Sequence, residues 1–583
     1  MAPTRDRMLR VDLSTGRVRS EAIPPEWLSR FVGGKGVGAR YLYEELPRGT
    51  DPESPENVLL FALGPLSGYT PGDQRYAAIT KSPLTGAFLD SYGGGSFPGR
   101  LAGSLPGHLG ILVTGRAERP VALHANDDDV TIESTEDLRG LDAAETCEAF
   151  PEGAVACIGP AGENGVKYAT IASDGGDHHA GRGGAGAVMG SKNLKAVVAR
   201  GPEPEPSGRL LELHDRTEEA FAGGHAGRWL AASDTLETAE FADAVGALPT
   251  RGWQEGRFDG TSGIGIERAR EASVGRERPD DAVPGGFRVD TETGESVPRG
   301  ATPIVLGAGL GIDDFDAVAT LGAVCDRLAL DVITAGNAVA WAVRASERGL
   351  IDREIGFGDE GAARTLIEEI ADRSTPLGDA LAEGVESAAE RFGGEGLIPT
   401  VKGMELSSYD PRNAETMALA YATSDRGACH RRARPIEIEA VSGDATGVSE
   451  RAAAVIEEQD RRALLWSLIA DDFLDDVFRG DLGSEWLSAV GYDLDPDELA
   501  LTGERIWTLV RLFNVREGFS RADDELPPTL TEPLAGEDAG LDRASFERLL
   551  DAYYARRDWD REGRPTTTLL QRLDLTEVPS GPG

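Results

Sequence analysis

The chain is poor in cysteine and histidine, and this scarcity excludes several kinds of site. Its 583 residues include 4 Cys and 7 His. No two cysteines have a C-x-x-C or similar spacing, and no H-E-x-x-H pattern occurs. The spacing therefore favours neither a disulfide framework nor a zinc site. We predict no metal-ligating side chains.

Basic residues, and lysine above all, are also scarce. The chain has 59 Lys+Arg against 100 Asp+Glu, a formal net charge of −41, and only six of the basic residues are lysine. A protein that neutralises nucleic-acid phosphates or binds an anionic membrane surface needs the opposite charge. The composition is typical of halophilic adaptation, because concentrated salt screens self-repulsion. Intrinsic disorder, the alternative, is disfavoured by the 40% hydrophobic content.

Long apolar runs are absent as well. No stretch approaches the ~18 apolar residues of a membrane span. The opening residues, MAPTRDRMLRVDLSTG, lack the apolar region of a signal peptide, so we expect a cytoplasmic protein. A chain of this length predicts roughly two to four domains.

Short apolar runs broken by glycine dominate the first third and predict β-strands. The proline-rich GPEPEPSG at 201–208 predicts a linker, and helical periodicity follows it, divided near residue 400 by GLIPTVKG. The expected strands cover 59–63, 77–80, 110–115, 154–159, 168–173 and 195–200, and the expected helices cover 312–328, 333–348, 361–373, 378–391, 449–470, 497–513 and 543–557. We predict an α+β protein with a β-rich domain over 1–206 and mainly helical domains over 207–403 and 404–583.

Glycine is abundant, with 74 residues, and it gathers in four loops. These are GGKGVG at 33–38, GPLSG at 64–68, SYGGG at 91–95 and AGRGGAG at 180–186. Without a Cβ, such loops can direct N–H groups toward a phosphate or another anion. Lys35 and Lys192 lie in or just after two of them and are predicted anion contacts.

One of these loops also satisfies G-x-G-x-x-G, through Gly181, Gly183 and Gly186. The intervening SDGGDHHA separates it too far from the preceding strand for a dinucleotide-binding turn, so glycines of a tight turn are the favoured alternative. Among the histidines, His178 and His179 are predicted to lie on a loop or to support a site. His430 follows Cys429 in a turn-like segment, and its imidazole is a candidate proton donor or acceptor, with a purely structural role left open.

Many longer segments resemble one family in the same order along the chain. They include FVGGKGVGARYL at 31–42, GPLSGYTPGDQRYAAITKSPLTG at 64–86, AGRGGAGAVMGSKNLKAV at 180–197, LGIDDFDAVATLGAVCDRLALDVITAGN at 310–337 and VKGMELSSYDPRNAETMALAYATSDRGACHRRA at 401–433. The family is the tungsten-containing aldehyde:ferredoxin oxidoreductases, and the resemblance covers nearly the whole chain.

The resemblance implies a β-rich base that carries a tungsten or molybdenum bis-pyranopterin, with Mg²⁺ bridging the pterin phosphates and two helical domains covering it. It implies an aldehyde substrate, a ferredoxin or other redox partner, and a possible homodimer. His430 would handle a proton. The cofactor-binding residues predicted from the loops and the resemblance are Gly34, Lys35, Gly36, Arg75, Gly93, Gly94, Ala180, Gly181, Arg182, Gly183, Lys192, Asp326 and Asp331.

The chain departs from the family where a [4Fe–4S] cluster is expected. Asp280, Val283 and Phe287 stand in place of the C-x-x-C-x-x-x-C cysteines, and the fourth position falls near Asp471. Because the cluster needs four thiolates, we predict that it is absent.

Two further motifs are altered. The first D-x-x-G-L-D motif has Ala329 instead of glycine, and the second has become WSLIAD at 466–471. The active-site glutamate of the family has no counterpart in GATP at 300–303. Two hypotheses follow: an enzyme that passes electrons directly to an external acceptor, or a non-catalytic paralogue or partner subunit that keeps the fold.

Overall fold

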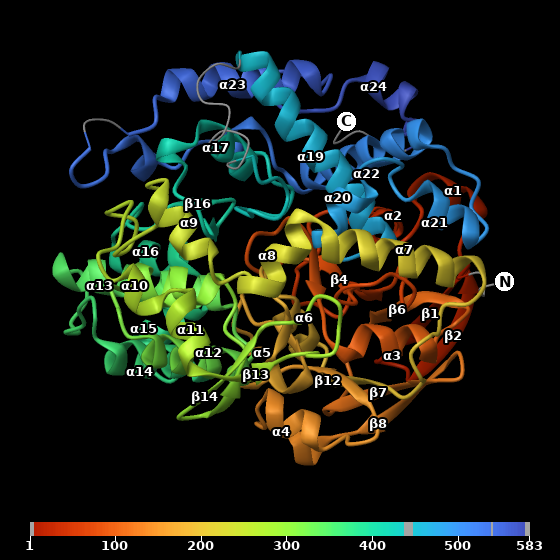
Figure 1. The fold of residues 1–583 in the computed structure, drawn as a ribbon, viewed down its shortest axis with the longest axis horizontal. Coiled ribbons are helices and arrows are strands. Elements are labelled where there is room, and N and C mark those ends of the chain that lie inside the picture. The colour runs from red at the N-terminus through yellow and green to blue at the C-terminus, as the bar shows by residue number, and fades with distance from the viewer. Residues whose placement is uncertain (1–4, 436–446, 538–539, 578–583) are drawn as a thin grey trace. The chain divides into compact units, whose positions relative to one another are not determined.

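The computed structural model describes residues 5–435, 447–537 and 540–577. Figure 1 shows the helices and strands as a ribbon. The chain forms two compact units. The first comprises Met1–Trp229, Asp326–Leu330 and Asp460–Glu517, and the second comprises Leu230–Cys325, Asp331–Gln459 and Gly518–Gly583. Each unit is therefore built from segments that lie far apart in the sequence.

Two six-stranded sheets form the centre of the first unit. The first has the order β2-β1-β6-β3-β4-β5 and the second the order β11-β10-β9-β12-β7-β8. The pairs β1·β6 and β7·β12 are parallel, whereas the other pairs are antiparallel. The strands are β1 (Arg7–Asp12), β2 (Arg17–Ala22), β3 (Leu59–Ala62), β4 (Tyr76–Lys81), β5 (Phe88–Gly93), β6 (His108–Thr114), β7 (Val121–Asn126), β8 (Asp129–Ser134), β9 (Ala154–Cys157), β10 (Ile171–Ser173), β11 (His178–Ala180) and β12 (Leu194–Ala199).

The sheets share one core of aliphatic and aromatic side chains, and this explains the apolar runs of the first third. All residues of β4 and β5 are buried, as expected for strands with both faces covered. The dinucleotide-binding alternative does not match the topology, because β10 pairs antiparallel with both β9 and β11 instead of entering a parallel β-α-β unit.

Helices of the first unit include α1 (Pro25–Phe31), α2 (Gly34–Glu45), α3 (Ser96–Ser104), α4 (Ala143–Glu148), α5 (Pro160–Glu163), α6 (Ala185–Ser191), α7 (Arg209–Gly223), α20 (Asp475–Phe478), α21 (Ser484–Ala489) and α22 (Pro496–Glu517). The helices α8 (His225–Ser233) and α19 (Val448–Leu468) each continue from one unit's segments into the other's. The predicted helices at 449–470 and 497–513 are confirmed within a few residues.

The second unit is mainly helical, as predicted. Its helices are α9 (Thr238–Ala244), α10 (Thr261–Ile264), α11 (Ile266–Ala272), α13 (Val332–Glu347), α14 (Glu360–Asp372), α15 (Pro376–Ala382), α16 (Val385–Phe392), α17 (Glu415–Ala422), α23 (Arg543–Arg556) and α24 (Thr567–Arg572), with α12 (Phe315–Leu328) crossing the division after Cys325. It also contains a small sheet of β13 (Ser273–Arg276), β14 (Phe287–Thr291) and β15 (Gly294–Ser296), and the pair β16 (Thr400–Val401) and β17 (Met404–Glu405).

The single helix predicted over 378–391 is wrong. Two helices, α15 and α16, take its place, and Gly384 between them has φ +103°. Such a backbone conformation favours glycine and cannot continue an α-helix. The apolar periodicity survives the break, and this is why the sequence pattern resembled one helix.

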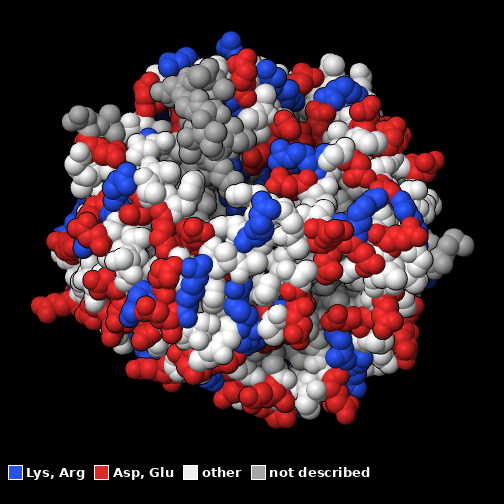
Figure 2. Space-filling view, viewed as in Figure 1, with Lys and Arg blue, Asp and Glu red and all other residues white. Residues whose placement is uncertain are grey.

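Figure 2 shows acidic side chains spread over the visible face, with Arg and Lys side chains among them, in keeping with the net charge of −41. None of the helices in the described ranges combines the length and the apolarity needed to cross a membrane.

Candidate functional site

A cluster of charged side chains lies where β5 ends in the glycines of the SYGGG loop. We call it the Arg75 cluster and define it as Asp73, Arg75, His178 and Asp471. Arg75 Nη1 lies 3.0 Å from Asp73 Oδ2, and its Nη2 lies 3.6 Å from Asp471 Oδ1. His178 Nδ1 lies 3.7 Å from the same Asp73 oxygen. The amide of Asp73 donates to Asp471 Oδ2 over 3.1 Å.

Glycine is needed beside this cluster for steric reasons. A Cβ on Gly94 would lie 2.7 Å from both Arg75 Nη1 and Asp73 Oδ2. On Gly95, whose φ is +79°, it would lie 2.0 Å from Asp174 Oδ2. The amide of Gly95 donates to Asp73 Oδ1 over 3.3 Å. The loop thus brings its backbone directly onto charged side chains of the protein itself.

The cluster perturbs the titration of its buried acid. Burial raises the pKa of Asp471 to about 6, with Arg75 opposing the rise and Asp472 and Asp73 adding to it. Asp471 is 4% exposed. Its charge is therefore poised to change just below neutral pH.

The loop at 180–183 lies at the end of β11. Ala180 is buried and pairs with Ile171 of β10. A Cβ on Gly181 would meet no atom within 4 Å, whereas Gly183 has φ +93° and its carbonyl accepts the Ser82 hydroxyl over 2.8 Å. Arg182 is 5% exposed. The backbone at Gly181 therefore faces open space that a larger residue would fill.

Lys35 lies in the interior of the first unit. Its ammonium is 3.0 Å from Asp90 Oδ2, and neither side chain is exposed to solvent. Three aromatic rings surround the ammonium, those of Phe88, Trp466 and Trp507, with centroids 5.1, 5.7 and 5.9 Å away. Tyr92 also donates its hydroxyl to Asp90 Oδ2 over 2.6 Å. The structure thus gives Lys35 a carboxylate partner within the fold.

Gly34 and Gly36 have packing reasons of their own. A Cβ on Gly34 would lie 2.4 Å from the Trp466 carbonyl oxygen, and one on Gly36 would lie 2.3 Å from that of Phe31. The amide of Gly34 donates to the Leu63 carbonyl and that of Gly36 to Ser467 Oγ. Gly93 likewise packs against the Tyr76 ring. These glycines let backbone segments approach closely.

Lys192 ends α6 and lies in a different part of the first unit. Its ammonium donates to the carbonyls of Pro55, Asn57 and Gly115. Burial, together with a smaller effect of the Arg116 charge, lowers the pKa of Lys192 to about 7. The side chain thus ties the loop before β3 to the end of β6.

The two D-x-x-G-L motifs keep a backbone conformation that suits glycine. Ala329 has φ +55° and Ile469 has φ +57°, although neither is glycine. In the first motif, Asp326 Oδ1 lies 3.3 Å from His179 Nε2. His179 also lies 2.7 Å from the Thr170 hydroxyl, so the second of the two histidines supports its surroundings. The substitutions changed the residue while the turn remained.

In the second unit, Asp331 begins α13. Its carboxylate accepts the amides of Ile333 and Thr334 as a helix N-cap. The Thr334 hydroxyl lies 2.8 Å from Asp331 Oδ2 and 2.9 Å from Glu405 Oε2. Glu405 is fully buried, and the sequence analysis did not single it out.

His430 also belongs to the second unit, and its Nδ1 lies 2.8 Å from Ser407 Oγ. The Tyr409 ring approaches the imidazole edge-on at a centroid distance of 6.5 Å. These contacts fix the orientation of the imidazole. One residue earlier, Cys429 Sγ accepts from Arg426 Nη2 over 3.0 Å.

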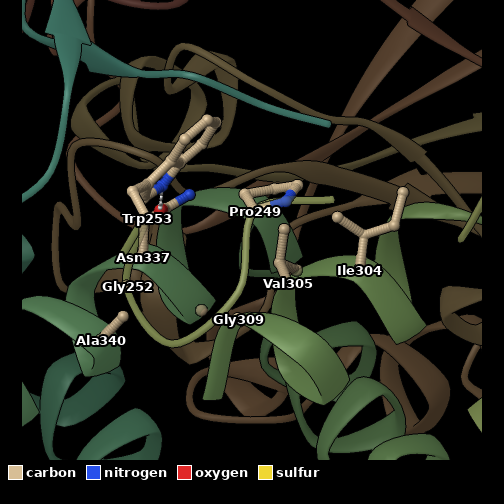
Figure 3. Close-up of a pocket in the computed structure, with 9 residues that line it drawn as sticks. Pro249, Gly252, Trp253, Ile304, Val305, Gly309, Asn337 and Ala340 are labelled. Carbon is tan, nitrogen blue, oxygen red and sulfur yellow. Dashed lines mark hydrogen bonds between the residues drawn. The ribbon is translucent and has the colours of Figure 1, made fainter. Parts of the chain in front are cut away.

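The second unit also contains a small, mostly apolar hollow of about 10 Å³, which is room for about one water molecule (Figure 3). Trp253 has φ +67°, and its indole Nε1 donates to Asn337 Oδ1 over 2.8 Å. Ile304 and Val305 line the hollow from a π-helical turn, η3 (Pro303–Gly307). π-turns and left-handed backbone at bulky residues are both enriched at functional sites. The remaining lining residues are Pro249, Gly252, Gly309, Gly336 and Ala340.

Comparison with known proteins covers almost the whole chain. Residues 8–201 match the family profile described as the N-terminal domain of aldehyde ferredoxin oxidoreductase, and residues 212–575 match that of its domains 2 and 3. This chain belongs to the aldehyde ferredoxin oxidoreductase family. The tungsten-containing aldehyde ferredoxin oxidoreductase of Pyrococcus abyssi is 35% identical over 618 residues, covering 98% of this chain and 99% of the relative. That of Pyrococcus horikoshii is 35% identical over 616 residues, with the same coverage.

A solved structure has the same fold at lower identity. The active-site complex of benzoyl coenzyme A reductase with 1,5-dienoyl-CoA superposes with a TM-score of 0.84, covers 99% of this chain and 97% of its own, and is 24% identical. The predicted α+β fold of this family is therefore confirmed. The relatives that share the family are named as oxidoreductases, and this chain is an oxidoreductase of that family.

The positions where the family resemblance placed cluster cysteines have other roles in this chain. Phe287 is buried in the core of the small sheet, with the Arg276 guanidinium 4.0 Å above its ring, and Asp280 is exposed. Glu277 holds the intervening loop, since its Oε2 accepts the Gly286 amide over 3.1 Å and lies 2.6 Å from Arg299 Nη2. No group of three or more His, Cys, Asp or Glu suited to a metal ion occurs among the described residues.

The structure thus gathers some predicted residues and separates others. Arg75, Gly93 and Gly94 lie together beside His178, and Asp471 joins them from a distant segment. Lys35 and Lys192 have internal partners of their own. The sequence analysis missed Glu405 and the Trp253–Asn337 pair. The available signal for Glu405 was an acid among apolar residues in VKGMELSS, and that for Trp253 was a tryptophan after glycine in GALPTRGW.

Proposed function

We propose that this chain oxidises an aldehyde, or reduces the corresponding acid, through a tungsten or molybdenum bis-pyranopterin and passes the electrons to ferredoxin or another external acceptor. The full-length membership of the family supports this proposal, since the named relatives at 35% identity are tungsten-containing aldehyde ferredoxin oxidoreductases. The same similarity favours an enzyme over a non-catalytic paralogue.

Residues of the first unit fit a cofactor with phosphate groups. A Cβ on Gly181 would meet open space, so a phosphate group could approach the backbone there, and Arg182 is the next residue in the chain. Arg75 and the Gly93–Gly94 backbone form the second predicted contact, with Mg²⁺ neutralising the phosphates and Asp326 offering a carboxylate. A bound metallopterin would supply two-electron redox chemistry at the metal.

The protein's own part in the reaction is to move a proton. His430 is the candidate proton carrier, because the Ser407 contact fixes its imidazole and a histidine changes charge near neutral pH. The hollow beside Trp253 has room for about one water molecule, so we assign it no part in binding the substrate.

The residues at the positions of the family's cluster cysteines do not fit an iron–sulfur centre, because the side chains of Asp280, Val283 and Phe287 cannot replace thiolates. We therefore propose no internal electron-transfer step through iron. The acceptor would take electrons from the metallopterin site directly.

Elemental analysis and turnover test the proposal together. Full-length protein purified from its host in high salt should contain about one tungsten or molybdenum and no stoichiometric iron, and it should reduce a viologen dye when an aldehyde is added. His430→Gln should lower kcat by about 10²–10⁴-fold while the metal content stays unchanged. His225→Gln, on an exposed histidine, is the matched control. Protein without tungsten, molybdenum or pterin would refute the proposal.

A further inference from the structure

Two cysteines that the proposed function does not use lie side by side in the first unit. Cys147 Sγ and Cys157 Sγ are 4.0 Å apart. Cys157 ends β9, is fully buried and pairs with both neighbouring strands, through Ala172 and Ala196. Cys147 lies near the end of the short helix α4 and is partly exposed. One cysteine is therefore partly exposed and the other lies fully buried beside it.

The surroundings of the two sulfurs differ in a way that suits thiol–disulfide exchange. The amide of Gly175 donates to Cys147 Sγ over 3.4 Å, whereas Cys157 Sγ donates to the Ala143 carbonyl over 3.7 Å. The contact with the Cys157 sulfur and the hydrogen bond from the Gly175 amide lower the pKa of the Cys147 thiol against the effect of burial. The pKa of the Cys157 thiol is raised. A lowered pKa marks the attacking thiol of a redox pair.

We propose that Cys147 and Cys157 form a reversible redox modification site whose oxidant is a low-molecular-weight disulfide. The Cys147 thiolate attacks one sulfur of the disulfide RSSR, forming a mixed disulfide and releasing RS⁻. Cys157 then loses its proton and attacks the Cys147 sulfur, releasing the second RS⁻. The protein dithiol loses two electrons and two protons, and RSSR becomes two RSH.

The geometry requires only a local movement. The sulfurs must approach from 4.0 Å to about 2.05 Å, the length of a disulfide bond. Because β9 is interior to its sheet, the end of α4 must move. The chain between the two cysteines contains the glycine turn around Gly153, which can absorb the change.

The movement would be transmitted to the Arg75 cluster through η2 (Asp174–Gly176). The amide of Gly175 donates to Cys147 Sγ. The carboxylate of the preceding residue, Asp174, accepts hydrogen bonds from the Ser96 amide, over 2.7 Å, and from the Ser96 hydroxyl. Gly95, whose amide donates to Asp73, precedes Ser96. Disulfide formation withdraws the Cys147 sulfur from Gly175 and loosens this chain of contacts. The proposal stands independently of the cofactor and of the aldehyde reaction.

Glutathione disulfide is the probe for the test. The native full-length chain is incubated with it, quenched with acid, unfolded and alkylated, and its peptides are analysed by mass spectrometry. We expect Cys147 and Cys157 joined in one cross-linked peptide pair that dithiothreitol reverses, with Cys325 and Cys429 alkylated. Cys147 should react at least about tenfold faster than either of those buried cysteines.

Variants separate the two steps. Cys157→Ser should stop at the mixed disulfide on Cys147, Cys147→Ser should yield neither product, and Cys325→Ser should behave as wild type. Hydrogen exchange at residues 174–176 should increase on oxidation. If both cysteines of the wild type remain alkylatable at equilibrium, or are joined only after unfolding, the proposal is overturned. The alkylation result on the wild-type chain tests the proposal even if one of the variants fails to fold.

Discussion

Removal of the Lys35 ammonium tests whether this side chain serves the fold itself. The ion pair with Asp90 is 3.0 Å long and excluded from solvent, and three aromatic rings surround its cation. Lys35→Met would leave Asp90 with the Tyr92 hydroxyl but without its counter-charge. Breaking a buried pair in this way costs about 3–5 kcal/mol of unfolding free energy.

A double variant separates the pair from the packing. Lys35→Met combined with Asp90→Asn removes both charges while keeping an oxygen acceptor for the Tyr92 hydroxyl. We expect it to recover much of the loss, since a buried pair replaced as a whole is often nearly neutral. Urea unfolding of the metal-free chain gives the free energies, and hydrogen exchange of α2 and β5 localises the effect.

Salt dependence provides the control. The loss in Lys35→Met should be nearly the same at low and high ionic strength, because a buried pair is screened little. Arg119, which is 70% exposed beside Glu136, forms a surface pair, and Arg119→Gln should change stability by less than about 0.5 kcal/mol. If Lys35→Met costs under 1 kcal/mol in the metal-free chain, the structural role assigned to Lys35 is wrong.

Three further predictions concern the two motif turns and the hollow. The raised pKa of Asp471 means that the folded chain binds a proton more tightly than the unfolded chain, so the free energy of unfolding should fall as pH rises from about 4 to about 6. Asp471→Asn should flatten this slope in thermal unfolding and raise the free energy of unfolding by up to about 3 kcal/mol above pH 7. An unchanged slope would contradict the pKa assigned to Asp471. Ala329→Gly should raise stability by up to about 1 kcal/mol, because it relieves the left-handed φ, and a clear loss in urea unfolding would argue against strain there. Asn337→Leu should cost about 1–3 kcal/mol of unfolding free energy by leaving the Trp253 indole N–H without its acceptor, and a wild-type urea midpoint would contradict this role of the hydrogen bond.

Local patterns predicted most of the regular structure. The helical periodicity over 312–328 predicted a helix that is α12, and that over 333–348 predicted α13. The error at 378–391 arose because apolar periodicity continues through Gly384, while the chain direction changes there. Periodicity records which side chains are buried and carries little information about where the axis bends.

The glycine loops show a second limit of prediction from local sequence. A glycine-rich sequence predicts close backbone approach, but the approaching group can be a ligand, a side chain or another backbone. Gly34 meets the Trp466 carbonyl, Gly94 meets Arg75, and Gly181 meets open space. These three outcomes follow from segments elsewhere in the chain, so no local pattern could distinguish them.

The amino-acid sequence by itself determined the acidic charge, the lack of cysteine at positions 280, 283, 287 and 471, and the order of strand-rich and helix-rich regions. These properties depend on residue identity and short-range spacing. The tertiary structure decided the partners: Asp90 for Lys35, Arg75 for Asp471, and Cys157 for Cys147. Partners are fixed when distant segments pack, since the free energy of a buried charge or sulfur depends on whatever group the fold places within a few ångströms of it.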